Sequence, residues 1–93
     1  MSIKVARQPE TGTAKVTFSL PSDFPAGAVS VVGTFNDWTP GVHPLKNRAG
    51  GVRTTSVTVP AGTTLRFRYL GAGGAWFDDA DATPSEDGGV LEV

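Results

Sequence analysis

Short segments in which apolar and polar side chains alternate form the clearest pattern along the chain. In residues 15–20 and 65–70, every second side chain is apolar. Because successive side chains of a strand point to opposite faces of a sheet, both segments are predicted to be half-buried strands, with Arg66 and Arg68 on the outer face. The side chains predicted to face inward are Val16, Phe18, Leu20, Leu65, Phe67 and Tyr69.

Runs rich in β-branched residues predict further strands. Residues 28–32 and 53–59 have the composition of buried strands, with Val57 and Val59 expected to face the core. Shorter strands are predicted at residues 3–7 and 90–93. Clusters of Gly and Pro separate these segments, and no stretch shows helical periodicity with caps. The pattern predicts an all-β chain of about seven or eight short strands, arranged as an antiparallel two-sheet sandwich.

The stretch 29–40 combines a strand with a sharp bend. After its β-branched run, Gly33 permits a bulge or close packing of the backbone. The Asn-Asp pair at positions 36 and 37 favours a turn, and Pro40 prevents the strand from simply continuing. Trp38 is therefore expected at a bend beside the sheet, where it either closes the core or offers a flat surface for stacking.

The composition places the chain among small globular domains that depend on packing for stability. Its 93 residues are expected to form one domain spanning 1–93, and the absence of cysteine excludes disulfides and thiol-based metal sites. A net charge of −1 gives no electrostatic reason to expect nucleic acid or a membrane as partner. Strand alternation also separates Phe67 and Tyr69 from Arg66 and Arg68, so these residues cannot form one nucleic-acid platform. Without a signal-peptide pattern or a membrane span, a cytoplasmic location is expected.

The polar residues do not suggest catalysis or metal binding. His43 is the only histidine, which excludes a multi-histidine metal site, and a structural loop position is expected for it. Asp78, Asp79 and Asp81 lie close in sequence, lack the spacing of a calcium loop and are expected to form a solvated acidic loop. No convincing carboxylate pair for glycoside hydrolysis is present. We therefore expect no enzyme activity, no cofactor and no metal site.

Several ordered segments resemble carbohydrate-binding module family 48, whose members precede the barrel of isoamylases and branching enzymes and occur in the β subunit of AMP-activated protein kinase. Residues 31–38, Val-Val-Gly-Thr-Phe-Asn-Asp-Trp, resemble its G-x-F-N-x-W signature. Residues 59–62 with 67–69 are similar to its L-P-x-G and F-R-Y strand. Residues 74–79 resemble its G-x-W-x-x-D turn, and 87–93 look like a degraded D-N-S-V-V-E-V ending.

This resemblance implies an immunoglobulin-like, early-set sandwich that binds α-glucans such as glycogen, starch or maltooligosaccharides. It implies that Trp38 and Trp76 stack on sugar rings and that Arg68 donates hydrogen bonds to hydroxyl groups. Asn36 is a further candidate for carbohydrate contact, although its type also suits turn formation. In the family, the segment around Leu45 is a short strand, and the residue at the position of Leu45 packs inward. Residues 47–51 are expected to form a loop after it.

One departure from the family pattern leaves alternatives open. The sugar-contacting asparagine of the family falls at Gly88, so a hydrogen bond at the rim of the site is lost. The alternative is a protein-interaction or regulatory sandwich with a degraded sugar site. A separate structural interpretation is that both tryptophans only close the sandwich. A further alternative is an accessory domain of a glucan-modifying enzyme, which makes such an enzyme or another protein a possible partner. The initiator-like Met1 and the strand that ends at Val93 favour an independent small protein.

Overall fold

Two long strands, β2 (Thr13–Pro21) and β5 (Val52–Pro60), form the centre of the first sheet. They pair antiparallel from Thr13↔Pro60 to Pro21↔Val52. In this register, the inward side chains of one strand lie beside the inward side chains of the other. The strands β1 (Ser2–Gln8) and β4 (Lys46–Arg48) complete this sheet at its two edges, in the order β1-β2-β5-β4. The computed structural model describes residues 2–23, 27–79, 82–86 and 88–93.

The second sheet is built around β6 (Thr64–Leu70), the other strongly alternating segment of the chain. Its strand order is β3-β6-β9-β8, and β7 also pairs with β6. The bounds of these strands are β3 (Ser30–Gly33), β7 (Trp76–Phe77), β8 (Thr83–Ser85) and β9 (Gly88–Glu92). Two single-turn 3-10 helices, η1 (Thr34–Asn36) and η2 (Ala72–Gly74), follow β3 and β6.

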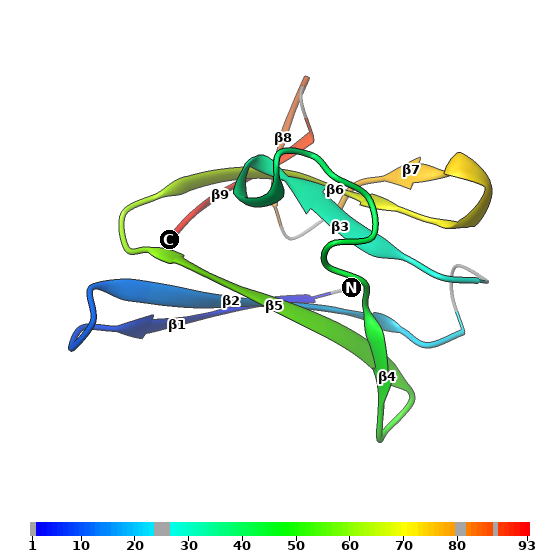
Figure 1. Ribbon diagram of the computed structural model, residues 1–93, viewed down its shortest axis with the longest axis horizontal. Coiled ribbons are helices and arrows are strands. Elements are labelled where there is room, and N and C mark those ends of the chain that lie inside the picture. The colour runs from blue at the N-terminus through cyan, green and yellow to red at the C-terminus, as the bar shows by residue number, and fades with distance from the viewer. Residues whose placement is uncertain (1, 24–26, 80–81, 87) are drawn as a thin grey trace.

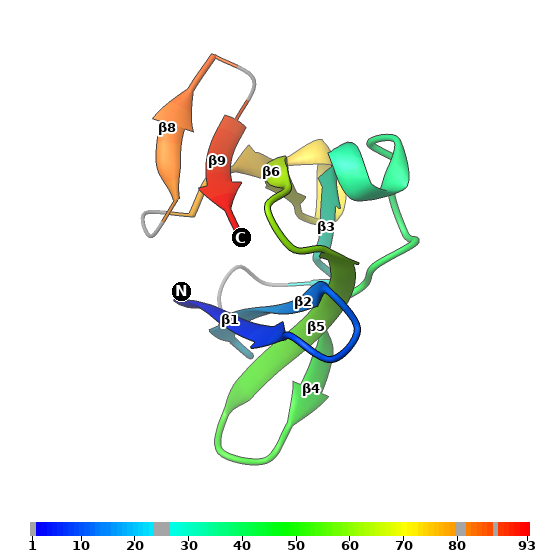
Figure 2. The same cartoon turned by 90° about the vertical axis from the view of Figure 1, so that its left-hand side faces the viewer.

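The two sheets face each other as the layers of a sandwich (Figures 1 and 2). The order β1-β2-β5-β4 opposite β3-β6-β9 is the A-B-E-D and C-F-G order of the immunoglobulin fold. The strands β7 and β8 lie in the connection between β6 and β9. The predicted immunoglobulin-like antiparallel sandwich is therefore confirmed, with nine strands among the described residues where seven or eight were expected.

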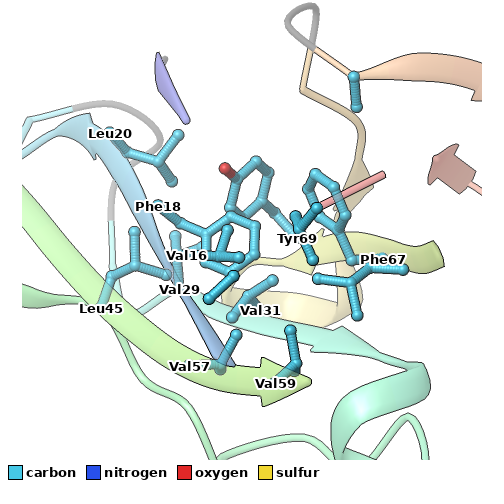
Figure 3. Close-up of a cluster of buried hydrophobic side chains, with 14 residues drawn as sticks. Val16, Phe18, Leu20, Val29, Val31, Leu45, Val57, Val59, Phe67 and Tyr69 are labelled. Atoms are coloured by element: carbon cyan, nitrogen blue, oxygen red, sulfur yellow. The ribbon is translucent and has the colours of Figure 1, made fainter. Parts of the chain in front are cut away.

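The core lies between the sheets and contains every side chain that the sequence predicted to face inward (Figure 3). Phe18 joins the two layers, because its ring centroid lies 4.9 Å from that of Phe67 and 6.2 Å from that of Tyr69 on the opposite sheet. Leu45 is buried as the resemblance implied, at 8% exposure. Burial of such aromatic and aliphatic side chains is the main source of stability in a domain without disulfides.

The structure corrects two expectations for polar segments. Asn47 and Arg48 were expected in a loop, but they belong to β4 because their backbones pair with Arg53 and Val52 of β5. Asp79 was expected in a solvated loop, but it is 3% exposed and its Oδ2 accepts a 2.7 Å hydrogen bond from the Tyr69 hydroxyl. Asp78 is exposed as expected, whereas Asp81 lies outside the described residues.

No helix in the described part of the chain has the length and apolar character needed to cross a bilayer.

Candidate functional site

The candidate site begins at Gly33, where β3 ends against β6. Its backbone is extended, with φ −175°, and it leaves no room for a side chain. A Cβ atom on Gly33 would lie 2.4 Å from the carbonyl oxygen of Arg66 and 2.9 Å from Cβ of Phe67. Gly33 was expected to permit either a bulge or close packing, and the structure shows close packing. The chain leaves the sheet immediately after it.

The turn after Gly33 is held by the side chain of Asn36. Its Oδ1 accepts a 3.0 Å hydrogen bond from the Gly33 amide, and its Nδ2 donates to the Val31 carbonyl at 3.1 Å. The same Nδ2 lies 2.9 Å from Nδ1 of His43, so the imidazole accepts at this nitrogen. The carboxamide of Asn36 is thus engaged by the turn, and Asn36 does not line the groove that holds the other predicted residues.

Trp38 is placed by two consecutive residues in the left-handed region. Asp37 has φ 53° and Trp38 has φ 57°, which is uncommon for residues other than glycine. Such a conformation costs about 1–2 kcal/mol per residue, so the surrounding contacts must hold it. One of these contacts is the hydrogen bond from the Trp38 amide to the Gly33 carbonyl, at 2.9 Å.

Strand pairing brings Arg68 and Trp76 to the same outer face of the second sheet. Trp76 of β7 lies directly opposite Leu70 of β6, and opposed residues in an antiparallel pair point to the same side. Arg68 precedes Leu70 by two positions and therefore shares that face. Along the same edge, β6 pairs with β9 up to Phe67 and with β7 from Tyr69, so Arg68 lies where the partner strand changes.

Both tryptophans and Arg68 line one open groove of about 500 Å³ on this face. Among the described residues, the rest of the lining consists of Thr34, Arg66 and Glu86. The Trp76 side chain is 52% exposed, Trp38 is partly buried, and neither belongs to the core cluster between the sheets. Neither tryptophan is therefore a side chain of the core cluster between the sheets.

Arg68 is fixed by two neighbours from different segments. Its Nη2 donates a 3.0 Å hydrogen bond to the backbone carbonyl of Glu86. Its Nε lies 3.4 Å from Oδ1 of Asp78, which forms an ion pair without the geometry of a hydrogen bond. The side chain of Arg68 is 35% exposed, so it reaches solvent at the groove while its inner end is covered.

Sequence reasoning missed three residues of the groove. Arg66 carried a usable signal, because it lies two positions before Arg68 on the same outward face. Thr34 lies beside it, since its Oγ1 accepts a 3.4 Å hydrogen bond from the Arg66 amide across 32 positions of sequence. Glu86 carried no signal, because its place at the groove depends on how β8 and β9 meet β6.

The groove offers two indole surfaces, guanidinium donors, a hydroxyl and a carboxylate, a set that suits a ligand with apolar faces and a polar rim. Among the described residues, no group of three or more His, Cys, Asp or Glu side chains lies close enough to hold a metal ion.

Comparisons of the chain with family models, with curated proteins and with solved structures found no match.

Proposed function

We propose that this domain is a non-catalytic binding module for α-glucans such as glycogen, starch or maltooligosaccharides. The observation that carries the proposal is that Trp38, Trp76 and Arg68, which come from three separate segments, line one groove. The resemblance of the sequence to family 48 modules assigns sugar contact to these same three positions.

The chemistry of the groove supports a sugar ligand. Each pyranose ring has C–H faces that pack on flat aromatic side chains, and hydroxyl groups around the rim that need hydrogen-bond partners. The exposed indole of Trp76 supplies an aromatic face, while Arg66, Arg68 and Thr34 supply donors near it. A volume of about 500 Å³ lies within the range of small-molecule sites, and the open form of the groove suits a chain rather than an isolated monosaccharide.

The proposal is tested by titrating maltoheptaose and β-cyclodextrin while tryptophan fluorescence and amide NMR shifts are recorded. We expect saturable changes for the unaltered protein. Trp76→Ala is expected to weaken binding by about tenfold, which corresponds to about 1.4 kcal/mol, because it removes the most exposed stacking surface. Trp38→Ala with Trp76→Ala is expected to abolish binding.

Val42→Ala is the matched control, since Val42 is also 52% exposed but does not line the groove. It should bind like the unaltered protein. Full retention of sugar affinity in the double tryptophan variant would contradict the proposal, as would the absence of any saturable change at millimolar sugar.

A second candidate function is a protein-interaction or regulatory domain that uses the same groove. It is favoured because polar groups expected to contact sugar already have partners within the fold. The Asn36 carboxamide holds a turn, and Arg68 contacts Asp78 and Glu86. Under this alternative, the indoles would be anchors for a protein partner, such as a glucan-metabolising enzyme. Two results together would favour this function. The unaltered protein would bind no glucan, and it would recover a protein partner that the tryptophan variants fail to recover.

A further inference from the structure

Gly88 presses against the side chain of Arg68 at the start of β9. Its φ of +109° lies in a region that side-chain-bearing residues rarely adopt. A Cβ atom at this position would lie 2.7 Å from Cγ of Arg68, 3.1 Å from its Nε and 2.6 Å from the carbonyl oxygen of Phe67. The carbonyl of Gly88 also accepts a 2.6 Å hydrogen bond from the Ser85 hydroxyl, which fixes this end of the β8–β9 hairpin. A larger residue at position 88 therefore has to displace Arg68 or the strand.

The covered end of Arg68 is held between Gly88 and Asp78. Its Nε is buried, has no hydrogen bond to any described residue and lies 3.4 Å from the Asp78 carboxylate, which is close enough for ionic attraction. The other end of the guanidinium is held by the Glu86 carbonyl. The backbone of Gly88 and the charge of Asp78 thus act on the same part of the side chain.

The position of Arg68 determines the shape of the groove. Arg68 and Trp76 line the 500 Å³ groove and also a neighbouring hollow of about 200 Å³, which Phe77 and Asp78 line as well. The Arg68 side chain therefore forms part of the wall between the two hollows, next to the most exposed indole. If it swung away, the groove would lose both a donor and a wall.

We propose that Gly88 and Asp78 are positioning residues, which hold Arg68 at the groove beside Trp76 without contacting the ligand themselves. The expected effect of these residues on sugar affinity rests on the proposed glucan-binding function. This positioning role reverses the expectation from sequence that a glycine at position 88 merely removes a sugar contact. Asparagine at this position adds no rim ligand, because it displaces the donor that is already there.

The affinity test compares Gly88→Asn with a control glycine of similar backbone conformation. Gly50 has φ +87° and lies in the turn before β5, on the other sheet. A Cβ atom on Gly50 would meet no other atom within 4 Å. Gly88→Asn is expected to weaken maltoheptaose binding at least tenfold, and Gly50→Asn is expected to leave it within twofold. Equal or tighter binding by Gly88→Asn would overturn the inference while leaving the glucan-binding function intact.

A second readout does not need the sugar. The Nε–H resonance of Arg68 is followed by nitrogen-15 NMR in Gly88→Asn, in Gly50→Asn and in Asp78→Asn. Asp78 is 53% exposed, so this last substitution removes charge without endangering the fold. The resonance should move in Gly88→Asn and Asp78→Asn but not in Gly50→Asn, and Asp78→Asn should also weaken sugar binding two- to fivefold.

The same arrangement predicts a change at Trp76. In a Trp38→Phe background, where Trp76 is the only tryptophan, Gly88→Asn should increase quenching of its fluorescence by acrylamide. An unmoved Arg68 resonance in Gly88→Asn and Asp78→Asn would overturn the inference, whether or not the protein binds glucan. Failure of the unaltered protein to bind any glucan would instead count against the proposed function alone.

Discussion

Tyr69 and Asp79 form a buried polar contact at the edge of the core. Tyr69 is fully buried, and its ring centroid lies 5.2 Å from that of Phe77, next to Trp76 on β7. Its hydroxyl donates to the nearly buried carboxylate of Asp79. The hydrogen bond therefore ties β6 to the segment that follows β7.

Removing this hydroxyl is expected to destabilise the fold. Tyr69→Phe keeps the ring packing but deletes the donor to a buried carboxylate, which should lower the free energy of unfolding by about 1–3 kcal/mol. Urea unfolding followed by circular dichroism measures the change. The exposed Thr58→Ala in β5 serves as the control and should change stability by no more than about 0.5 kcal/mol. Equal unfolding midpoints for Tyr69→Phe and the unaltered protein would contradict this role.

At the scale of secondary-structure elements, strand alternation made most of the fold predictable. The apolar side chains of β2, β5 and β6 that were predicted to face inward follow from a local period of two, and all of them are buried. The residues that pattern reasoning misplaced depend on long-range pairing instead. Asn47 is in a strand because Arg53 lies opposite it, and Asp79 is buried because Tyr69 reaches it. Such contacts between distant segments leave no local signal.

The turn formed by η1 and the two residues after it is the element on which the groove depends. Asn36→Ala removes the acceptor for the Gly33 amide and the donor to the Val31 carbonyl, and it should cost about 1–3 kcal/mol of stability. Because Trp38 sits in a strained conformation next to this network, its amide NMR signal should shift as well. Sugar affinity should fall even though Asn36 does not line the groove.

Asn36→Asp is compared with Asn36→Ala to separate the acceptor role of this side chain from its donor role. It retains an acceptor for the Gly33 amide but cannot donate to Val31 or His43, so its loss of stability should be intermediate. If Asn36→Ala were as stable as the unaltered protein and left the Trp38 signal unmoved, this account of the turn would be wrong.

At the scale of the whole molecule, the two sheets share one core and should unfold together. Phe18 extends from β2 to the rings of Phe67 and Tyr69 on the opposite sheet, so it contributes to the stability of both layers. The predicted sandwich is confirmed. The groove could be placed only from the actual strand order, because its lining residues come from η1, the turn after η1, β6, β7 and the turn before β9. Sequence motifs identified three of its lining residues and could not place Glu86.

Truncating Phe18 tests the shared core. Phe18→Ala is expected to lower the free energy of unfolding by about 3–5 kcal/mol, a large part of the about 5–15 kcal/mol typical of a whole domain. Val52→Ala, at a side chain that is 37% exposed, should have little effect. Unfolding by urea should remain a single transition by tryptophan fluorescence and by circular dichroism. Separate midpoints for the two signals would show that the sheets unfold independently.

The outer face of the first sheet lies on the opposite side of the sandwich from the groove and takes no part in lining it. Ser56 of β5 is exposed on that face, opposite Thr17 of β2. Because the chain contains no cysteine, a single thiol introduced by Ser56→Cys would be unique. Coupling through it would anchor every molecule to a solid support in one orientation, with the tryptophans turned toward the liquid.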